Sequence, residues 1–114
     1  MQNQRTEILI GENGVNTLSQ KSVLVVGVGG VGGYVCEMLA RCGVGRLTLV
    51  DFDKVDITNI NRQIVALHST VGQNKVEAIK TRIHDINPNI EVTAICQKIL
   101  SENIEKILST KFDF

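Results

Sequence analysis

Tryptophan is absent from this sequence of 114 residues, proline occurs once, and phenylalanine and tyrosine together contribute only 4%. The hydrophobic fraction of 43% and the charged fraction of 21% are nevertheless ordinary. They exclude a collagen-like, coiled-coil or disordered chain. A chain of this length can bury about 60–70% of its unfolded surface. We therefore expect one globular unit with a hydrophobic core.

An excess of charge of either sign is also missing, because twelve basic residues balance twelve acidic ones. The overall charge thus gives no reason to expect nucleic-acid or membrane binding, although a local patch stays open. No apolar run approaches the roughly 20 residues that span a bilayer. Residues 1–7 lack the basic-then-apolar order of a secretory signal. We expect no membrane association.

Cysteine is scarce, and the cysteines do not follow a paired spacing. The three cysteines are Cys36, Cys42 and Cys96, and no two of them have Cys-x-x-Cys spacing. An odd number at these spacings fits neither a disulfide framework nor a zinc site. We expect three small, buried apolar residues in a protein of the reducing cytoplasm.

What is present is an alternation of apolar strands and amphipathic helices. Strands are predicted over 22–26, 47–50 and 90–96, and helices over 34–42, 74–86 and 101–108, the last with Ser101 as its N-cap; one or two short helices are predicted over 6–18. This order is typical of a Rossmann-like, doubly wound α/β fold with a mostly parallel sheet. Residues 111–114 fall where a fourth strand would begin. We therefore expect a helical segment over 1–20, followed over 21–114 by the N-terminal part of a longer Rossmann-like domain.

A glycine-rich loop joins the first strand to the following helix. Gly27, Gly29 and Gly32 match G-x-G-x-x-G in the strand-to-helix context that makes this motif informative. Glycines let the backbone approach phosphate closely, and the helix N-terminus presents free N–H groups to it. Asp51 ends the second strand, where a carboxylate can accept hydrogen bonds from ribose hydroxyls. The loop therefore favours nucleotide binding, with close helix–strand packing as the alternative; no P-loop motif is present.

Cationic and amide side chains beyond the second strand bear on which nucleotide is bound. Arg62 and Lys75 could offset the charge of a triphosphate, and Asn59 and Gln63 are neutral donors. Lys75 opens a helix, where a cation is disfavoured by the helix dipole unless an anion lies nearby.

Each cation also has a purely structural interpretation. Arg62 could form a surface salt bridge with Asp53 or Asp56. Lys75 could be solvated, or pair with Glu77 or a loop carboxylate.

Five ordered blocks carry a resemblance to a known family. Residues 27–32, 51–55, 59–63, 71–77 and 86–88 resemble the ThiF/MoeB/HesA superfamily of ATP-dependent adenylating enzymes, which are related to the ubiquitin-activating enzymes. The resemblance extends from about Arg5 to Phe114. Within the superfamily, residues 58–68 are most similar to the tRNA threonylcarbamoyladenosine dehydratases. The activators of sulfur-carrier proteins more often read Asn-Leu-Gln-Arg-Gln in this region.

The resemblance implies roles for individual residues. Glycines of the loop, among them Gly30, would pack against the phosphates, and Asp51 would hold the ribose. The triphosphate would be contacted by Asn59, Arg62 and Lys75, supported by Gln63 and assisted by Asp53. Arg5 matches an arginine that such homodimers insert into the ATP site of the partner subunit. The aspartate that binds Mg²⁺ in this superfamily follows a fourth strand, beyond Phe114, so this chain alone is expected to be inactive.

The resemblance implies a reaction and leaves alternatives. The leading interpretation is ATP-dependent dehydration and cyclisation of threonylcarbamoyladenosine in tRNA by way of an acyl-adenylate. One alternative is adenylation of the C-terminal glycine of a ubiquitin-like sulfur-carrier protein, which shares every motif above. A non-catalytic nucleotide-binding module is another. An NAD-dependent oxidoreductase would explain the glycines and Asp51 but would leave Arg62 and Lys75 without a role.

Overall fold

The centre of the molecule is a parallel sheet of three strands. The computed structural model describes residues 1–114. Its strands are β1 (Ser22–Val26), β2 (Arg46–Val50) and β3 (Glu91–Ile95), and β2 lies between the other two. Leu47, Leu49 and Val50 of the central strand are almost completely buried, which explains its continuous apolar run. The predicted strands and the parallel sheet are confirmed, with shifts of one residue at some ends.

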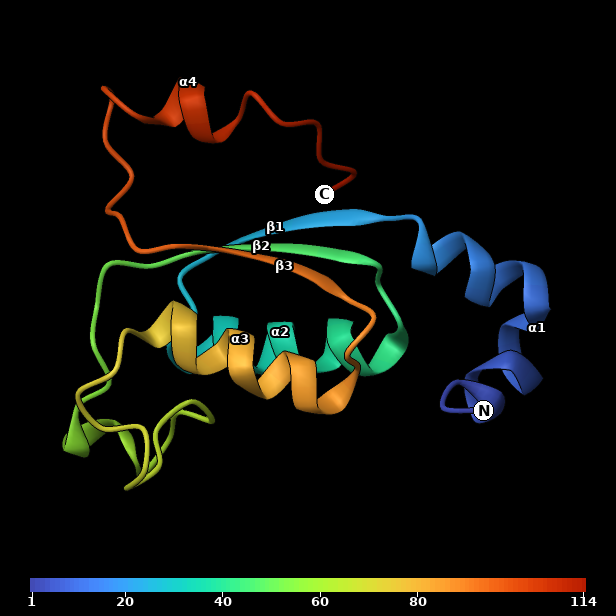
Figure 1. The fold of residues 1–114 in the computed structure, drawn as a ribbon, viewed down its shortest axis with the longest axis horizontal. Helices are drawn as coiled ribbons and strands as arrows, with labels where there is room; N and C mark the ends of the chain where they lie inside the picture. The colour runs from blue at the N-terminus through green and yellow to red at the C-terminus, as the bar shows by residue number, and fades with distance from the viewer.

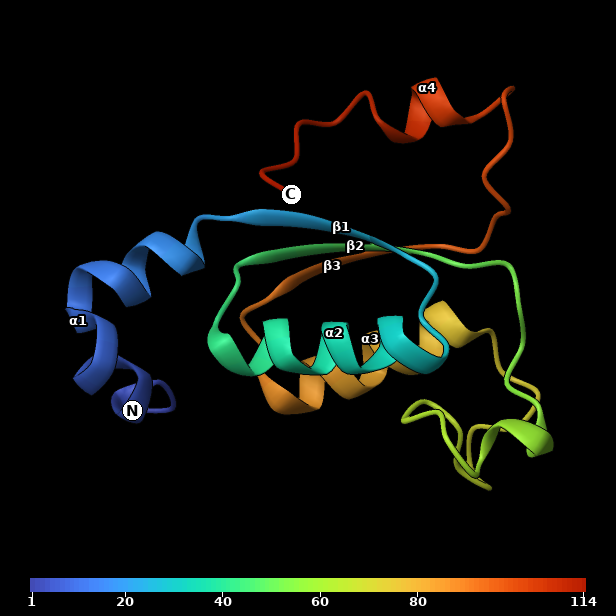
Figure 2. The same cartoon turned by 180° about the vertical axis from the view of Figure 1, so that it is seen from behind.

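Two helices lie side by side on one face of this sheet, α2 (Gly30–Cys42) and α3 (Lys75–Ile86) (Figures 1 and 2). The predicted stripe of α3 faces the core, with Val76, Ile79 and Ile83 buried. α2 begins four residues earlier than the sequence predicted. The glycines that we assigned wholly to the loop already form its first turn, where the Gly33 N–H donates to the Gly29 carbonyl.

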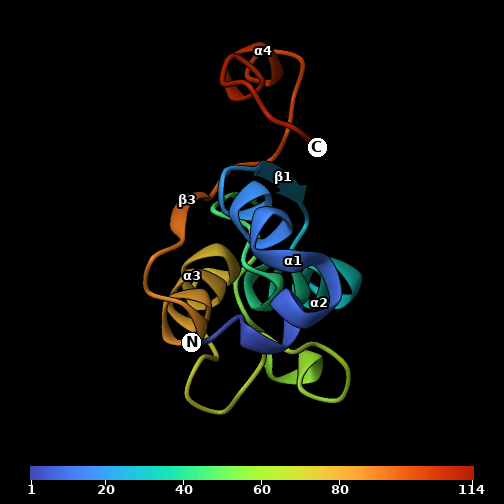
Figure 3. The ribbon, with the colours of Figure 1, turned by 90° about the vertical axis from the view of Figure 1, so that its right-hand side faces the viewer.

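The connections lie at opposite ends of the strands. Residues 51–74, which include the short helix η1 (Ile57–Asn59), follow the carboxyl end of β2, whereas α1 (Gln4–Ser19) precedes the amino end of β1 (Figures 1 and 3). α1 is two helical pieces joined at Gly11, whose φ is +77°. This confirms the prediction of one or two short helices. None of the helices combines the length and the hydropathy required to cross a membrane.

The opposite face of the sheet is covered differently. α4 (Ile104–Ile107) and the segment after it lie on the side away from α2 and α3 (Figure 1). The predicted helix over 101–108 is present only as the single turn of α4, and the prediction of Ser101 as its N-cap is wrong because Asn103 occupies that position. Asp113 and Phe114 hydrogen-bond through their backbones to Ser22 and Leu24 of β1, but residues 111–114, where the start of a fourth strand was predicted, do not form a strand.

The cysteines do not all behave as predicted. Cys36 of α2 is buried in the core, and burial raises the pKa of its thiol to about 12. Cys42 and Cys96 are exposed, so the prediction of a buried residue is wrong for both. Cys42 lies in the last turn of α2, and Cys96 immediately follows the edge strand β3. All three thiols are free.

Candidate functional site

The glycine loop turns sharply from β1 into α2. Gly27 has a φ of +84°, which favours glycine, and its N–H donates to the Val50 carbonyl. A Cβ on Gly32 would lie 1.6 Å from the Gly27 carbonyl oxygen, so only glycine fits there. A Cβ on Gly30 would meet nothing within 4 Å. Packing within the chain therefore explains why position 32 requires glycine. It does not explain Gly30, the first residue of α2, where an added Cβ would contact no neighbouring group.

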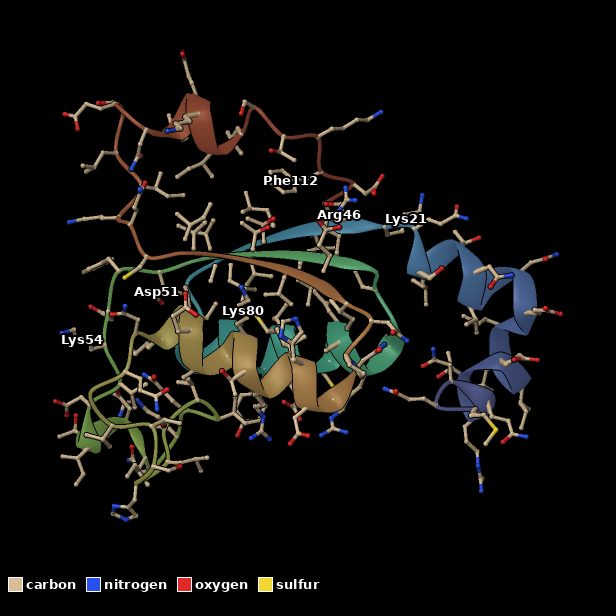
Figure 4. The ribbon with its side chains drawn as sticks, in the orientation of Figure 1. Lys21, Arg46, Asp51, Lys54, Lys80 and Phe112 are labelled. Carbon is tan, nitrogen blue, oxygen red and sulfur yellow. The ribbon has the colours of Figure 1, made fainter.

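Asp51 ties the end of β2 to this loop. Its Oδ2 accepts a hydrogen bond from the Val28 N–H and its Oδ1 from the Asp53 N–H, both at 2.9 Å. A carboxylate oxygen has a second lone pair, so both oxygens can still accept from a ligand hydroxyl. Asp51 is half-buried at the end of the sheet where the long connection begins (Figure 4).

A cavity of about 210 Å³ lies at the carboxyl ends of the strands. It is lined by the ends of β1 and β2, the start of the long connection, and the segment after β3: Val26, Gly27, Val50, Asp51, Phe52, Asp53, Gln97, Lys98 and Ile99. Ligands of open α/β sheets bind in this crevice. Typical ligand pockets measure about 300–1,000 Å³, so this cavity would hold only part of a nucleotide. A cavity of about 710 Å³ between the other face of the sheet and α4 lacks the glycine loop altogether.

Phe52 and Lys98 are members of this site that sequence reasoning missed. The Lys98 ammonium lies 5.6 Å from the centre of the Phe52 ring, within the range of a cation–π contact. Both follow strand ends, Phe52 after β2 and Lys98 after β3. The rule that parallel strands gather their carboxyl ends at one edge was the signal that could have found them.

Lys75 is a buried cation at the N-terminus of α3. Its side chain is only 7% exposed, and its Nζ lies 3.7 Å from Oδ2 of Asp53, whose side chain is 52% exposed. The Lys75 N–H also donates to the Asp53 carbonyl. Pairing with a loop carboxylate, one of the alternatives for Lys75, is therefore observed. An ammonium has three donors, and this single long contact leaves it able to bind a further anion.

Asn59 helps to shape the connection. It is buried, and its Oδ1 accepts from the Asp56 N–H, while Oδ1 of Asp56 accepts from the N–H and the hydroxyl of Thr58. These bonds from Thr58 hold the pKa of Asp56 below its usual range. Because the side-chain oxygen of Asn59 accepts from the N–H of Asp56, the N-cap residue of η1, the side-chain NH₂ of Asn59 is the group left to donate to a ligand.

Arg62 and Gln63 lie on the same connection. The Arg62 guanidinium is exposed and donates from Nη1 to the Thr58 carbonyl and to Oδ1 of Asn61. The alternative of a salt bridge to Asp53 or Asp56 is not observed. Gln63 packs against Gly29, and its buried Oε1 has no hydrogen-bond partner. Gln63 therefore couples the connection directly to the glycine loop.

Arg5 is not brought to this site within one chain. It lies on α1, which precedes the amino end of β1, whereas the glycine loop follows its carboxyl end (Figure 1). The predicted role of Arg5 therefore requires a second copy of the chain. The structure contains no group of three or more His, Cys, Asp or Glu side chains placed to hold a metal ion.

A series of contacts connects the parts of the site. The glycine loop contacts Asp51, Asp51 contacts Asp53, and Asp53 contacts Lys75. The N-termini of α2 and α3 both carry partial positive charge, and Lys75 adds a full one. The open space at Gly30, the helix ends and the cation fit a phosphate chain, and Asp51 fits a hydroxyl-bearing sugar.

Comparisons with known proteins agree with this geometry. A family model described as the ThiF family matches residues 2–114. The chain is 52% identical over 110 residues to a tRNA threonylcarbamoyladenosine dehydratase of Bacillus subtilis. A crystal structure of the Escherichia coli tRNA N6-threonylcarbamoyladenosine dehydratase in complex with ATP superposes with a TM-score of 0.92 at 40% identity, over 95% of this chain. An adenylyltransferase and sulfurtransferase of Zea mays is 46% identical over 82 residues, or 72% of this chain.

The matched relatives are longer than this chain. The alignments cover 96%, 95% and 72% of this chain but only 43% of the Bacillus protein, 44% of the crystallised Escherichia coli chain and 18% of the Zea mays protein, in that order. The chain therefore spans less than half the length of the relatives that it matches.

Proposed function

Because this chain belongs to the ThiF family, we propose that it forms part of the ATP site of an enzyme that adenylates a carboxylate. The observation that carries the proposal is the series of contacts from the glycine loop through Asp51 and Asp53 to Lys75. It sets hydroxyl acceptors beside two helix N-termini and a buried cation. The ATP complex of the Escherichia coli relative supports the same nucleotide for this chain.

Each residue has a role that follows from its chemistry. The N–H groups at Gly30 and the start of α2 bind phosphate, and Asp51 accepts from the ribose hydroxyls. Lys75 and Arg62 offset charge on the β- and γ-phosphates as pyrophosphate leaves. Asn59 donates its amide NH₂, and Gln63 holds the connection against the glycine loop. Asp53 holds Lys75 in place. Bound Mg²⁺, which the resemblance implies, would offset further phosphate charge.

The proposed reaction needs no nucleophile from the enzyme. A carboxylate oxygen of the substrate attacks the α-phosphorus, the bond to pyrophosphate breaks, and an acyl-adenylate forms. The buried thiol of Cys36, with its pKa raised to about 12, is unsuited to attack.

The proposed substrate is threonylcarbamoyladenosine in tRNA. A nitrogen of its ureido group attacks the activated carbonyl, that nitrogen loses a proton, and AMP leaves with the carboxylate oxygen. The product is cyclic, and the net change in the nucleoside is the loss of one water. The identity of 52% to the Bacillus dehydratase, against 46% over a shorter span to the Zea mays protein, favours this substrate.

A second candidate is adenylation of the C-terminal glycine of a ubiquitin-like sulfur-carrier protein. The similarity to the Zea mays adenylyltransferase and sulfurtransferase is the observation in its favour. The first step is identical in the two reactions, so the residues of this chain would have the same roles.

The proposal extends to assembly, domain organisation and location. We propose a homodimer in which Arg5 of one copy reaches the nucleotide of the other. Residues 1–20 would form a helical segment and residues 21–114 part of the adenylation domain. A cytoplasmic location is consistent with three free cysteines.

The test uses the complete reading frame that encodes this chain. The purified protein is incubated with ATP, Mg²⁺ and tRNA bearing threonylcarbamoyladenosine, and the digested nucleosides are weighed by mass spectrometry. We expect an ATP-dependent loss of one water from that nucleoside. Arg62→Ala should abolish it, whereas the matched control Arg46→Ala, at an exposed arginine far from the glycine loop, should not.

Other outcomes are informative. An unchanged nucleoside together with exchange of pyrophosphate into ATP would support the sulfur-carrier substrate. ATP binding with no exchange in the presence of either substrate would support a non-catalytic nucleotide-binding module. Absence of ATP binding would contradict the whole proposal.

A further inference from the structure

A buried carboxylate joins the two helices that begin at the site. Glu37 of α2 is only 6% exposed. Its Oε1 accepts from Nε of Arg82 on α3 at 2.6 Å, and its Oε2 accepts from Nε of Arg41 at 2.8 Å. These contacts, from Arg82 foremost, hold the pKa of Glu37 below its usual value. We call the Glu37–Arg82 pair the helix clamp.

The clamp lies at the same height on both helices. Glu37 is seven residues after Gly30, the first residue of α2, and Arg82 is seven residues after Lys75, the first residue of α3. Seven residues are about 10 Å along a helix. The two helices run in the same direction beneath the sheet (Figure 2). Pairing Glu37 with Arg82 therefore sets the N-termini of α2 and α3 level with each other.

From this register we infer that Glu37 and Arg82 are positioning residues for the nucleotide. The clamp holds Lys75 at the height of the glycine loop, so that the cation and the N–H groups of α2 face one phosphate chain together. This inference rests on the proposed function, because it specifies how the phosphate-binding groups of that ATP site are held in position. Neither residue is among those that we assign to contact the nucleotide.

Apolar packing alone would define the register of α2 relative to α3 only weakly, and the polar clamp adds a contact of fixed geometry. The surfaces of α2 and α3 that meet the core carry small and branched apolar residues, among them Cys36, Ala40, Ile79 and Ile83. Such surfaces tolerate small sliding movements, whereas a two-pronged guanidinium–carboxylate contact has a fixed geometry. Arg82 is 36% exposed, so it can hydrate if Glu37 is neutralised. We therefore expect the fold to survive Glu37→Gln with its helix register loosened.

The test measures nucleotide affinity in the complete protein by calorimetry. ATP and AMP are titrated into the wild type, Glu37→Gln, Lys75→Met and the double variant. Mutations that act through such coupling change affinity by about threefold to thirtyfold, and we expect Glu37→Gln to weaken ATP binding within this range. AMP, which lacks the phosphates assigned to Lys75, should lose less affinity. The double variant should bind ATP no more weakly than Lys75→Met alone, because Glu37 acts through Lys75.

Two further variants secure the interpretation. Arg82→Gln removes the clamp from a partly exposed side chain and should reproduce the effect of Glu37→Gln. Glu91→Gln breaks the exposed Arg46–Glu91 pair between β2 and β3 and should leave ATP affinity unchanged. Wild-type affinity for ATP in Glu37→Gln, equal losses for ATP and AMP, or additive losses in the double variant would overturn the inference. Failure of the wild type to bind ATP would instead overturn the proposed function.

Discussion

At the scale of single residues, the glycines of the loop have different reasons to be there. Gly27 has a positive φ, and Gly32 approaches the Gly27 carbonyl too closely for any side chain. Gly30 has neither constraint. The fold therefore requires glycine at positions 27 and 32, whereas Gly30 leaves open space in which a ligand would bind.

Two alanine substitutions separate these requirements. Gly32→Ala should lower the free energy of unfolding by about 1–3 kcal/mol or more, because its Cβ overlaps a backbone oxygen. Gly30→Ala should change it by no more than about 1 kcal/mol, while weakening ATP binding. Urea denaturation and ATP titration of the complete protein measure the two effects. A Gly30→Ala variant with wild-type ATP affinity would place the phosphates elsewhere.

Lys75 carries the strongest prediction for one side chain. Hydrogen bonds to charged groups contribute about 1.5–3 kcal/mol, so Lys75→Met should weaken ATP binding about tenfold to hundredfold. Methionine keeps the length and apolar stem of the lysine. Lys54→Met, on the exposed start of the same connection (Figure 4), is the matched control and should have no effect. Equal affinities of the two variants would refute the role of Lys75.

The sequence predicted the positions of the candidate residues in the fold better than it predicted their contacts. The strand–glycine–helix pattern predicted where Gly27 and Asp51 lie, because both are defined by local chain direction. The pairing of Lys75 with Asp53 was only one of several alternatives, since it depends on how the long connection folds back. Phe52 and Lys98 were missed because their contact joins segments that are distant in sequence.

At the scale of elements, the clamp between α2 and α3 predicts a dependence of stability on pH. The pKa of Glu37 is lowered in the folded state from its ordinary value of 4.5. Its ionised form therefore stabilises the fold above that value, and this contribution is lost as the pH falls through the lowered pKa. The difference in unfolding free energy between wild type and Glu37→Gln should be constant near pH 7 and shrink below about pH 4.5. Urea denaturation across this range measures it, and a difference that stays constant at low pH would contradict it.

Element boundaries were predicted well where the sequence pattern and the packing agree. α3 begins one residue later than predicted and ends as predicted, because its apolar stripe is buried and residues 87–88 stop it. α2 starts earlier than predicted. Its first residues, among them Gly30, are helical although glycine has a low helix propensity. α4 is shorter than predicted because only Ile107 is buried, and a short helix without a buried face is marginal.

At the scale of the whole molecule, the outer face of α2 is apolar and open. Val31, Tyr34, Val35 and Met38 are exposed there, beside a hollow of about 600 Å³. Phe114, 91% exposed, lies at the end of a second apolar groove along β1. Exposed apolar surface of this kind is a docking surface or an aggregation hazard.

The chain of 114 residues expressed alone should therefore self-associate. Val31→Gln together with Met38→Gln should shift it toward the monomer, because both side chains are exposed and belong to the apolar face of α2. Ile57→Gln, at a site on the long connection about as exposed as Met38, is the control and should have no effect. Light scattering of all three proteins at matched concentration measures the mass. Monomeric wild-type chain would show that this surface is inert.

The central claim concerns the whole enzyme, namely that a substrate carboxylate attacks the α-phosphate of ATP at this site. The most direct test labels the threonyl carboxylate of threonylcarbamoyladenosine in tRNA with a heavy oxygen isotope and follows the label through turnover by the complete protein. Attack on the α-phosphorus predicts that one labelled oxygen leaves with AMP when the ring closes. Label in inorganic phosphate instead would mean attack on the γ-phosphorus, and would contradict adenylation as the function of this fold.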